Sequence, residues 1–151
     1  MKSSTFLVTA ADEETATLRD VFDQQVITLS ETPGLEADDV IEGTVEAEPP
    51  LEVAYRIDEI ERQWQIPVER SDESPTTLSR DIAAEQATGE ITKRERAGDG
   101  EFHVLTVPDA EAAAQDVLDD VATLERAARL GVDRVSVRVG DGVVSVRYLP
   151  N

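Results

Sequence analysis

The side chains best suited to bind a ligand are arginines on predicted strands, together with the single histidine of the chain. They flank or follow two Gly-Asp-Gly segments, at residues 98–100 and 140–142, and they alternate with apolar residues. A guanidinium group has a planar fork of donors that binds two phosphate oxygens at once. The sequence therefore predicts a phosphate- or RNA-binding surface made of Arg94, Arg96, His103, Arg134, Arg138 and Arg147.

Patterns typical of catalysis are missing from the sequence. One histidine and no cysteine cannot build the usual histidine or thiolate metal sites. The chain has no GxGxxG or Walker A segment and no GxSxG serine elbow. Paired acids such as Asp38-Asp39 and Asp119-Asp120 are too frequent to indicate a carboxylate active site. We expect no catalytic residue, metal or cofactor; an enzyme that uses His103 and neighbouring acids in a cleft remains an alternative.

The charge of the chain is strongly negative. It has 33 acidic and 14 basic residues, a formal charge of −19, and its only lysines are Lys2 and Lys93. Such a surface repels itself in dilute buffer, but about 1 M salt shortens the Debye length to about 3 Å. Because the acids are spread along the chain, they favour a halophilic protein with solvent cations at its surface over an acidic decoy for basic proteins.

Two expectations about location follow from the pattern of apolar residues. Residues 1–11 contain no long apolar run, so no signal peptide is expected. No stretch approaches the roughly 20 apolar residues that cross a bilayer. We therefore expect a cytoplasmic protein without a membrane partner.

The first seventy residues predict a small β-barrel or meander of the SH3-like or oligonucleotide-binding (OB) kind. Short β-rich runs alternate with acidic or Pro/Gly turns, and the turns include Thr32-Pro33-Gly34 and Pro49-Pro50. Trp64 is expected to fill a barrel end or a domain seam, with a role as a partner anchor as the alternative. The predicted strands are Ser4–Ala10, Thr15–Val21, Gln25–Ser30, Asp39–Glu46 and Leu51–Ile60.

A linker is expected at residues 71–76, followed by an αββαββ domain with an antiparallel sheet at residues 77–151. Thr77–Glu85 predicts a short helix, and Asp109–Leu130 predicts a long one that a break at Asp119-Asp120 would divide. Arg134–Val139 and Val143–Leu149 flank Asp141-Gly142, a two-residue hairpin signal. The two Gly-Asp-Gly segments favour an internal duplication or two unrelated hairpins with the same turn chemistry. The overall class is α+β.

The hairpin signals also predict which side chains share a face of the sheet. With Asp141-Gly142 as the loop, the valines of both strands face the helices and the arginines face the other way. With Asp99-Gly100 as the loop, Arg96 lies opposite His103, which places His103 among the arginines. This register also puts Lys93 and Glu95 on the core face, which favours an edge strand or a different turn length. The alternative is that the arginines form a solvent-exposed or domain-docking face.

Several segments resemble a haloarchaeal family of uncharacterised proteins, and the resemblance extends over nearly the full length. It implies a halophilic archaeal cytoplasm, and it assigns no activity and no functional residue. The segments that carry it are Thr5–Thr9, Leu18–Asp20, Ile66–Ser71, Arg94–Pro108, Leu124–Val139 and Val143–Pro150.

The function that these observations favour is that of a non-enzymatic binding or adaptor protein. Its partner would be RNA, a ribonucleoprotein or another protein. The alternative is a purely protein–protein scaffold, such as a homodimer joined through sheet edges.

Overall fold

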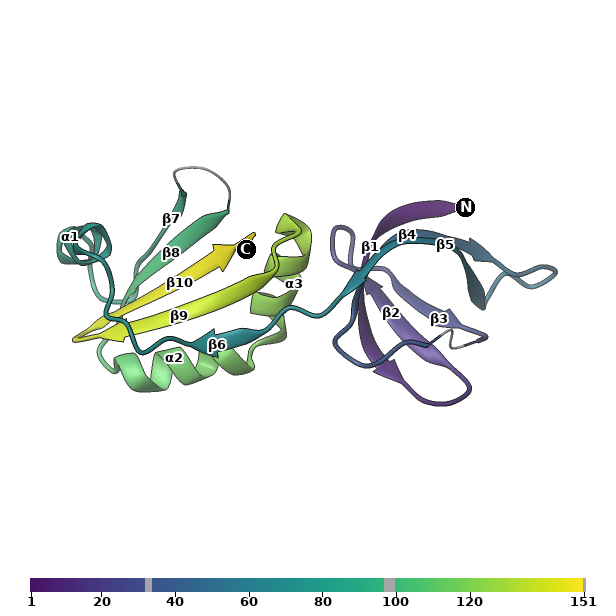
Figure 1. Ribbon diagram of the computed structural model, residues 1–151, viewed down its shortest axis with the longest axis horizontal. Helices are drawn as coiled ribbons and strands as arrows, with labels where there is room; N and C mark the ends of the chain where they lie inside the picture. The colour runs from purple at the N-terminus through teal and green to yellow at the C-terminus, as the bar shows by residue number, and fades with distance from the viewer. Residues whose placement is uncertain (32–33, 97–99, 151) are drawn as a thin grey trace. The chain divides into compact units, whose positions relative to one another are not determined.

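The computed structural model describes residues 1–31, 34–96 and 100–150 of the chain. The chain forms two compact units, Met1–Ile66 and Pro67–Asn151 (Figure 1). The first is a closed five-stranded barrel and the second is a five-stranded sheet with helices, so the class is α+β. The division falls before the expected one at residue 70, because residues 68–70 pair with the second sheet.

The barrel is built from β1 (Lys2–Ala11), β2 (Ala16–Asp20), β3 (Val26–Leu29), β4 (Val40–Ala47) and β5 (Tyr55–Trp64). The strand order is β1-β2-β3-β5-β4, and β1 is long enough to pair with both β2 and β4. Alternate apolar side chains point inward, and Phe6, Leu18, Ile27 and Ile41 are almost fully buried. The small β-barrel predicted from the sequence is confirmed.

The last strand of the barrel begins later than expected. The sequence predicted a strand at Leu51–Ile60, whereas β5 runs from Tyr55 to Trp64. Leu51 and Val53 alternate with polar residues, yet both are exposed. The preceding Pro49-Pro50 segment and the positive φ of Glu52 (57°) keep this stretch in a turn, so its alternation is not that of a strand.

A buried carboxylate joins the two ends of the first hairpin. Asp20 is 1% exposed, and it accepts hydrogen bonds from the backbone of Phe22 at 2.8 Å and forms an ion pair with Lys2 at 2.9 Å. Burial alone would raise the pKa of Asp20, but these bonds to its charged form outweigh burial and hold the pKa below its usual value.

The second unit begins with β6 (Val68–Arg70), α1 (Thr77–Glu85), β7 (Ile91–Glu95) and β8 (Glu101–Thr106). It continues with α2 (Ala110–Asp119), α3 (Val121–Leu130), β9 (Arg134–Gly140) and β10 (Val143–Leu149). The sheet order is β6-β9-β10-β8-β7, so β7 is an edge strand. The sheet is mixed, not purely antiparallel as predicted, because β6 pairs with β9 in parallel.

The long helix predicted at Asp109–Leu130 is two helices that meet at Asp120. The Asp120 side chain accepts a hydrogen bond from the Ala122 backbone at 2.9 Å, which caps α3, while its own N–H ends α2 by donating to Val117. An N-terminal cap satisfies backbone donors that a continuous helix would bond internally. The division between α2 and α3 therefore lies at the Asp119-Asp120 pair, where the sequence allowed a break.

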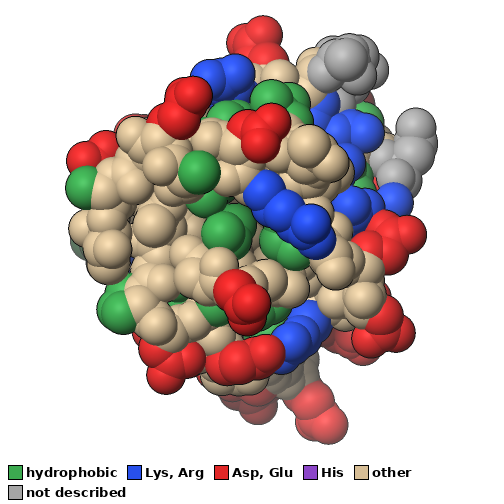
Figure 2. All heavy atoms as spheres, turned by 90° about the vertical axis from the view of Figure 1, so that its left-hand side faces the viewer, with side chains coloured by type: hydrophobic (Ala, Val, Ile, Leu, Met, Phe, Trp, Pro, Cys, Tyr) green, Lys and Arg blue, Asp and Glu red, His purple; other side chains and the backbone are tan. Residues whose placement is uncertain are grey.

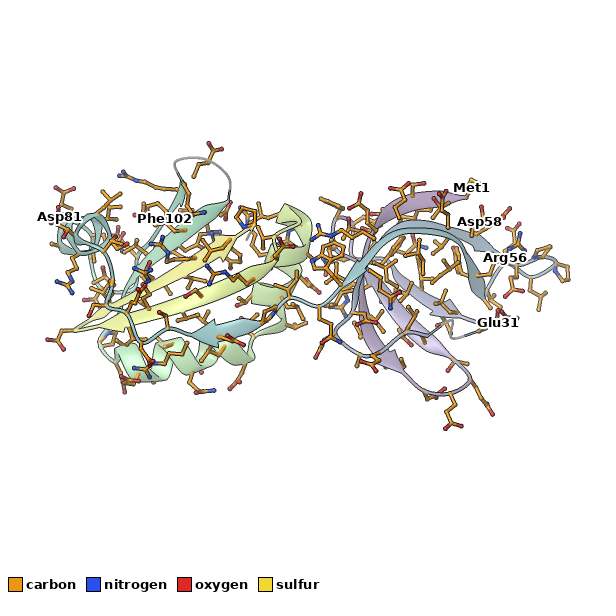
Figure 3. All side chains as sticks on the ribbon, viewed as in Figure 1. Met1, Glu31, Arg56, Asp58, Asp81 and Phe102 are labelled. Atoms are coloured by element: carbon orange, nitrogen blue, oxygen red, sulfur yellow. The ribbon has the colours of Figure 1, made fainter. Side chains whose placement is uncertain are left out.

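Helices cover both faces of the second sheet. We call the face covered by α2 and α3 the helix face. The side chains that point from it toward these helices include Val135, Val137, Val144 and Val146. Helix α1 packs on the opposite face, where Ile82 and Ala83 contact Phe102 and Val104 of β8. Phe102, labelled in Figure 3, belongs to this second face. The valines thus form the predicted apolar face, but only two of the three helices cover it.

Candidate arginine face and histidine pocket

Five of the predicted arginines lie on the face of the second sheet that also carries α1. Register places Arg147 of β10 opposite Ser136 of β9 and Phe102 of β8, and Phe102 is in turn opposite Arg94 of β7. Residues two positions away along a strand share the same face. We call this surface the arginine face, made of Arg94, Arg96, Arg134, Arg138 and Arg147.

Three of the arginines are close enough to Arg147 to affect its pKa. Burial lowers the pKa of Arg147, and the positive charges of Arg138, Arg96 and Arg134 lower it further. Glu73 acts in the opposite direction, and it forms an ion pair with Arg138 at 2.5 Å. Figure 2 shows the end of this unit that bears α1, where most of the blue Lys and Arg side chains in view gather on one side.

The face has more hydrogen-bond donors than acceptors. Within the described part of the chain, the Nε atoms of Arg138 and Arg147 are buried and have no hydrogen-bond partner. A guanidinium carries five N–H donors and no acceptor. Phosphate oxygens accept several hydrogen bonds each, and the planar fork of a guanidinium can donate two at once.

His103 does not join the arginine face, and this prediction was wrong. It pairs with Lys93 of β7 and Val146 of β10, not with Arg96, and so points to the helix face. Arg96 instead donates a backbone hydrogen bond to Gly100 at 3.2 Å, which leaves residues 97–99 between the paired positions. The change from the expected two-residue loop reverses the face of every β8 side chain. Asp99 of the predicted turn lies outside the described residues.

His103 is part of a buried hydrogen-bond network. Its Nε2 donates to Oε2 of Glu101 at 2.5 Å, and Arg126 of α3 donates to the same carboxylate from Nε at 3.0 Å and Nη2 at 2.8 Å. Burial lowers the pKa of His103, and the Glu101 charge restores only part of that shift, so the imidazole is neutral near pH 7. Burial would raise the pKa of Glu101, but His103 and Arg126 together hold it below its usual value.

The ring of His103 borders a pocket of about 310 Å³ between the sheet and the helices. Tyr148 of β10 lies beside it, with ring centroids 4.9 Å apart and planes tilted by 51°. Burial raises the pKa of Tyr148 to about 12, so its hydroxyl stays protonated. Within the described ranges no three potential ligand side chains gather to hold a metal ion.

Sequence reasoning missed two members of this network, Glu101 and Arg126. Glu101 and His103 occupy alternate positions of one strand and therefore share a face, a signal visible in the sequence. Nothing in the sequence indicates that Arg126, on a helix 25 residues later, reaches the same carboxylate.

The remaining predicted feature, Trp64, lies at the end of β5 in the barrel. The guanidinium carbon of Arg62 stands 3.6 Å from the centroid of its ring, a cation–π arrangement. Trp64 is half-buried, and it pairs with Val40 at the start of β4.

The fold and the arginine face together define an α+β protein in which a small closed barrel precedes a helix-flanked sheet with a cationic surface. The chain belongs to a family of unknown function, DUF5812, whose sequence profile matches residues 2–139. Neither a curated protein nor a solved structure matches the chain. Among the described helices, none has the length and apolar character that crossing a membrane requires.

Proposed function

We propose that this protein is a non-enzymatic binding module whose arginine face contacts the phosphate groups of RNA. The observation that supports this function is the gathering of five guanidinium groups on one face of a chain with a formal charge of −19. Three of the other four guanidinium groups are close enough to Arg147 to lower its pKa.

Acidic side chains are scarce on this face. Within the described residues, the sheet positions that point the same way include one acid, Glu69 of β6, and Glu73 approaches from outside the strands to pair with Arg138. The described strand positions of this face therefore carry more guanidinium groups than carboxylates. Because screening removes most long-range attraction in concentrated salt, short bidentate hydrogen bonds from arginine would carry the affinity.

The barrel is a less suitable nucleic-acid site, although we infer that it is of the OB type. Barrels of that type bind oligonucleotides with strands 2 and 3 and the loops after strands 1 and 4. Here those loops carry Asp12, Glu13, Glu14 and Glu48, which repel a polyanion. The arginine face is therefore the site we assign to RNA.

The strongly acidic composition supports a further part of the proposal, a halophilic cytoplasmic setting. Solvent cations would then surround the carboxylates and leave the arginine face as the main anion-binding surface.

The test is binding of a fluorescein-labelled single-stranded RNA, measured by anisotropy over a range of salt concentrations. Arg138→Gln/Arg147→Gln removes two charges from the arginine face. Arg56→Gln/Arg70→Gln removes two exposed charges elsewhere, because Arg70 of β6 lies opposite Val137 on the helix face. Arg56 is labelled on the barrel in Figure 3 and pairs with Glu46. Both double variants have the same net charge, so any difference reports the position of the arginines.

We expect the arginine-face variant to bind RNA at least about tenfold more weakly than the control, because hydrogen bonds to charged groups are worth about 1.5–3 kcal/mol each. Its salt slope should decrease by roughly 0.7 for each phosphate that the variant no longer neutralises. Equal affinity of the two variants would refute the site. Pull-down at molar salt with and without nuclease separates the alternatives, since nuclease-insensitive recovery supports a protein partner instead.

A further inference from the structure

Strand β7 forms one edge of the second sheet, and within the described part of this unit no strand lies beyond it (Figure 1). All of its residues except the half-buried Thr92 are exposed. The opposite edge, β6, has only three residues, and one of them, Arg70, pairs with Glu111 of α2. An open edge strand is a template for pairing with another chain, and β7 is the longer of the two edges.

The ladder with β8 determines which backbone groups of β7 face this open edge. The backbone of Arg96 donates to Gly100 at 3.2 Å, and hydrogen-bonded pairs of an antiparallel ladder recur at every second residue. Thr92 and Arg94 therefore bond with β8, and the N–H and C=O groups of the residues between and beside them point away from the sheet. These outward groups are those of Ile91, Lys93 and Glu95.

The side chains of β7 are complementary to those of a second, antiparallel β7. A two-fold axis at Thr92 would place Glu90 opposite Arg94 of the second copy on both sides of the axis, with one threonine facing the other. Opposite charges and threonines in facing positions both stabilise a strand pair. Within the described residues, neither Glu90 nor Arg94 forms an ion pair that would compete. On the other face, Ile91 is 47% exposed and would lie against the aliphatic stem of Lys93.

The other registers of the same pairing are less favourable. An axis at Lys93 would bring two ammonium groups into facing positions, and an axis at Arg94 would do the same for two guanidinium groups. Like charges directly opposite each other destabilise a strand pair. An axis at Ile91 would leave Arg94 and Glu95 opposite the turn that precedes the strand of the second copy. Of these four registers, the axis at Thr92 alone pairs opposite charges without facing like charges.

The helices leave room for this pairing. An antiparallel pair keeps equivalent faces on the same side, so α1 of both copies would lie on one side of the joined sheet. Ile82 and Ala83 place α1 over β8, and the β8 strands of the two copies would be three strand spacings, or about 14 Å, apart. This distance exceeds the diameter of a helix, about 10–12 Å. Helix α2 contacts β6, β9 and β10, which are farther from the edge.

We propose that β7 pairs with β7 of a second copy of this chain about a two-fold axis at Thr92, which joins the two sheets into one. The pairing adds about four backbone hydrogen bonds, made by Ile91 and Lys93 of both copies. It does not depend on the proposed RNA contact. It brings two arginine faces to the same side of one sheet.

The test is analytical ultracentrifugation of the full chain, whose monomer has a mass of 16.5 kDa. Two short strands make a small and weak interface, so the protein concentration runs from about 10 μM to about 1 mM. Potassium chloride at about 1 M shortens the Debye length to about 3 Å, which screens the repulsion between two chains of charge −19 but not groups in direct contact. We expect the average mass to rise with concentration toward twice that of the monomer.

Two charge variants test the register. Glu90→Arg and Arg94→Glu each place like charges opposite each other, so each alone should associate at least about fivefold more weakly than the unchanged protein. An equimolar mixture of the two restores both opposite-charge pairs in a heterodimer, and its association should return to within about twofold of the unchanged protein. Asp81→Arg and Arg80→Glu, at exposed positions of α1, change the net charge by the same amounts and are the controls. Alone or mixed, the controls should associate as the unchanged protein does.

Ile91→Pro tests the backbone contribution. Ile91 is the first residue of β7 and its N–H points outward, so proline removes a donor to the second copy without removing a bond to β8. We expect association at least about tenfold weaker. The resonance of His103, the only histidine, comes from the adjacent strand and checks that the unit remains folded. If this variant does not fold, the charge variants decide the matter without it.

Three results would overturn the proposal. One is a monomer mass for the unchanged protein up to about 1 mM. The second is equal association of the two β7 charge variants and the two α1 controls, which would place any contact elsewhere. The third is a mixture of Glu90→Arg and Arg94→Glu that associates no better than either variant alone, which would exclude the axis at Thr92.

Discussion

Replacing Glu101 by glutamine should destabilise the second unit and make His103 harder to protonate. In the native protein Glu101 is 9% exposed, and its carboxylate accepts hydrogen bonds from His103 and from two nitrogens of Arg126. Glutamine keeps the shape but loses the charge, and its amide NH₂ replaces one acceptor by donors. One of the facing N–H groups is then left without an acceptor.

The size of the effect follows from these contacts. Removing one partner of a buried ion pair costs about 3–5 kcal/mol. Because the Arg126 side chain is 34% exposed and can regain hydration, we expect Glu101→Gln to lower the free energy of unfolding by less than this, about 2–3 kcal/mol. For a unit of fewer than 100 residues this corresponds to a decrease in Tm of about 10–20 °C.

The single histidine and the single tryptophan allow each unit to be followed separately. Urea unfolding monitored by the His103 resonance reports the second unit, and Trp64 fluorescence reports the barrel. An NMR titration of His103 gives its pKa in the folded protein. Because the Glu101 charge raises that pKa, its removal should lower the pKa further below the usual value for histidine.

Glu85→Gln is the matched control, since it removes one exposed charge from α1 in the same unit. Substitutions at such positions usually change stability by less than about 0.5 kcal/mol. A Glu101→Gln protein as stable as this control, or one in which the pKa of His103 rises, would refute the network as described.

Three further outcomes are expected. In a urea series, the free energy of unfolding of the second unit should fall as pH decreases from about 6.5 into the acid range. The reason is that the pKa values of His103 and Glu101 are lower in the folded state, so the unfolded state binds more protons. A rise in stability over this range would contradict these two pKa shifts. Gly43→Ala should destabilise the barrel by about 1–3 kcal/mol in unfolding followed by tryptophan fluorescence, because a Cβ at this position would lie 2.2 Å from the Glu59 carbonyl oxygen. Glu42→Ala, at the exposed neighbouring position, is the control and should have little effect. Raising salt from 0.1 to 1 M should increase the unfolding free energy, since the Debye length falls from about 10 to about 3 Å and a charge of −19 is screened; loss of stability in sodium and potassium chloride alike would exclude self-repulsion as the dominant effect.

The last hairpin could be predicted because valines alternate with polar residues in both of its strands. In β9 and β10 valine and arginine alternate, and the two-residue Asp141-Gly142 loop fixes the register, so Val144 pairs with Val139 as expected. In such strands a slip of one residue would expose every valine. The pattern therefore determines both the pairing and the face.

Strand β8 does not have one apolar and one polar face, and the side of the sheet to which its side chains point was predicted incorrectly. Phe102 and Val104 are apolar on one side, and Leu105 is apolar on the other, next to His103. Both faces are buried, since α1 packs on Phe102 and Val104 and α3 approaches His103. A strand buried on both sides gives no signal for its orientation, so the error in loop length remained undetected.

Strand β6 illustrates a second limit. Its residues, Val68, Glu69 and Arg70, follow the barrel directly and showed no sign of belonging to the next unit. Only the parallel pairing with β9, more than sixty residues away, assigns them to the second sheet. Pairing of this range depends on tertiary contacts that no local pattern records.

The two faces of one sheet separate the cationic side chains of the second unit into two groups. Neighbouring residues of β10 point in opposite directions, so Arg147 joins the arginine face while Val146 and Tyr148 line the histidine pocket. In β7, Arg94 and Lys93 are divided in the same way. The sheet backbone between them keeps these cations apart, and each face has an ion pair, Arg138 with Glu73 on one and Arg126 with Glu101 on the other.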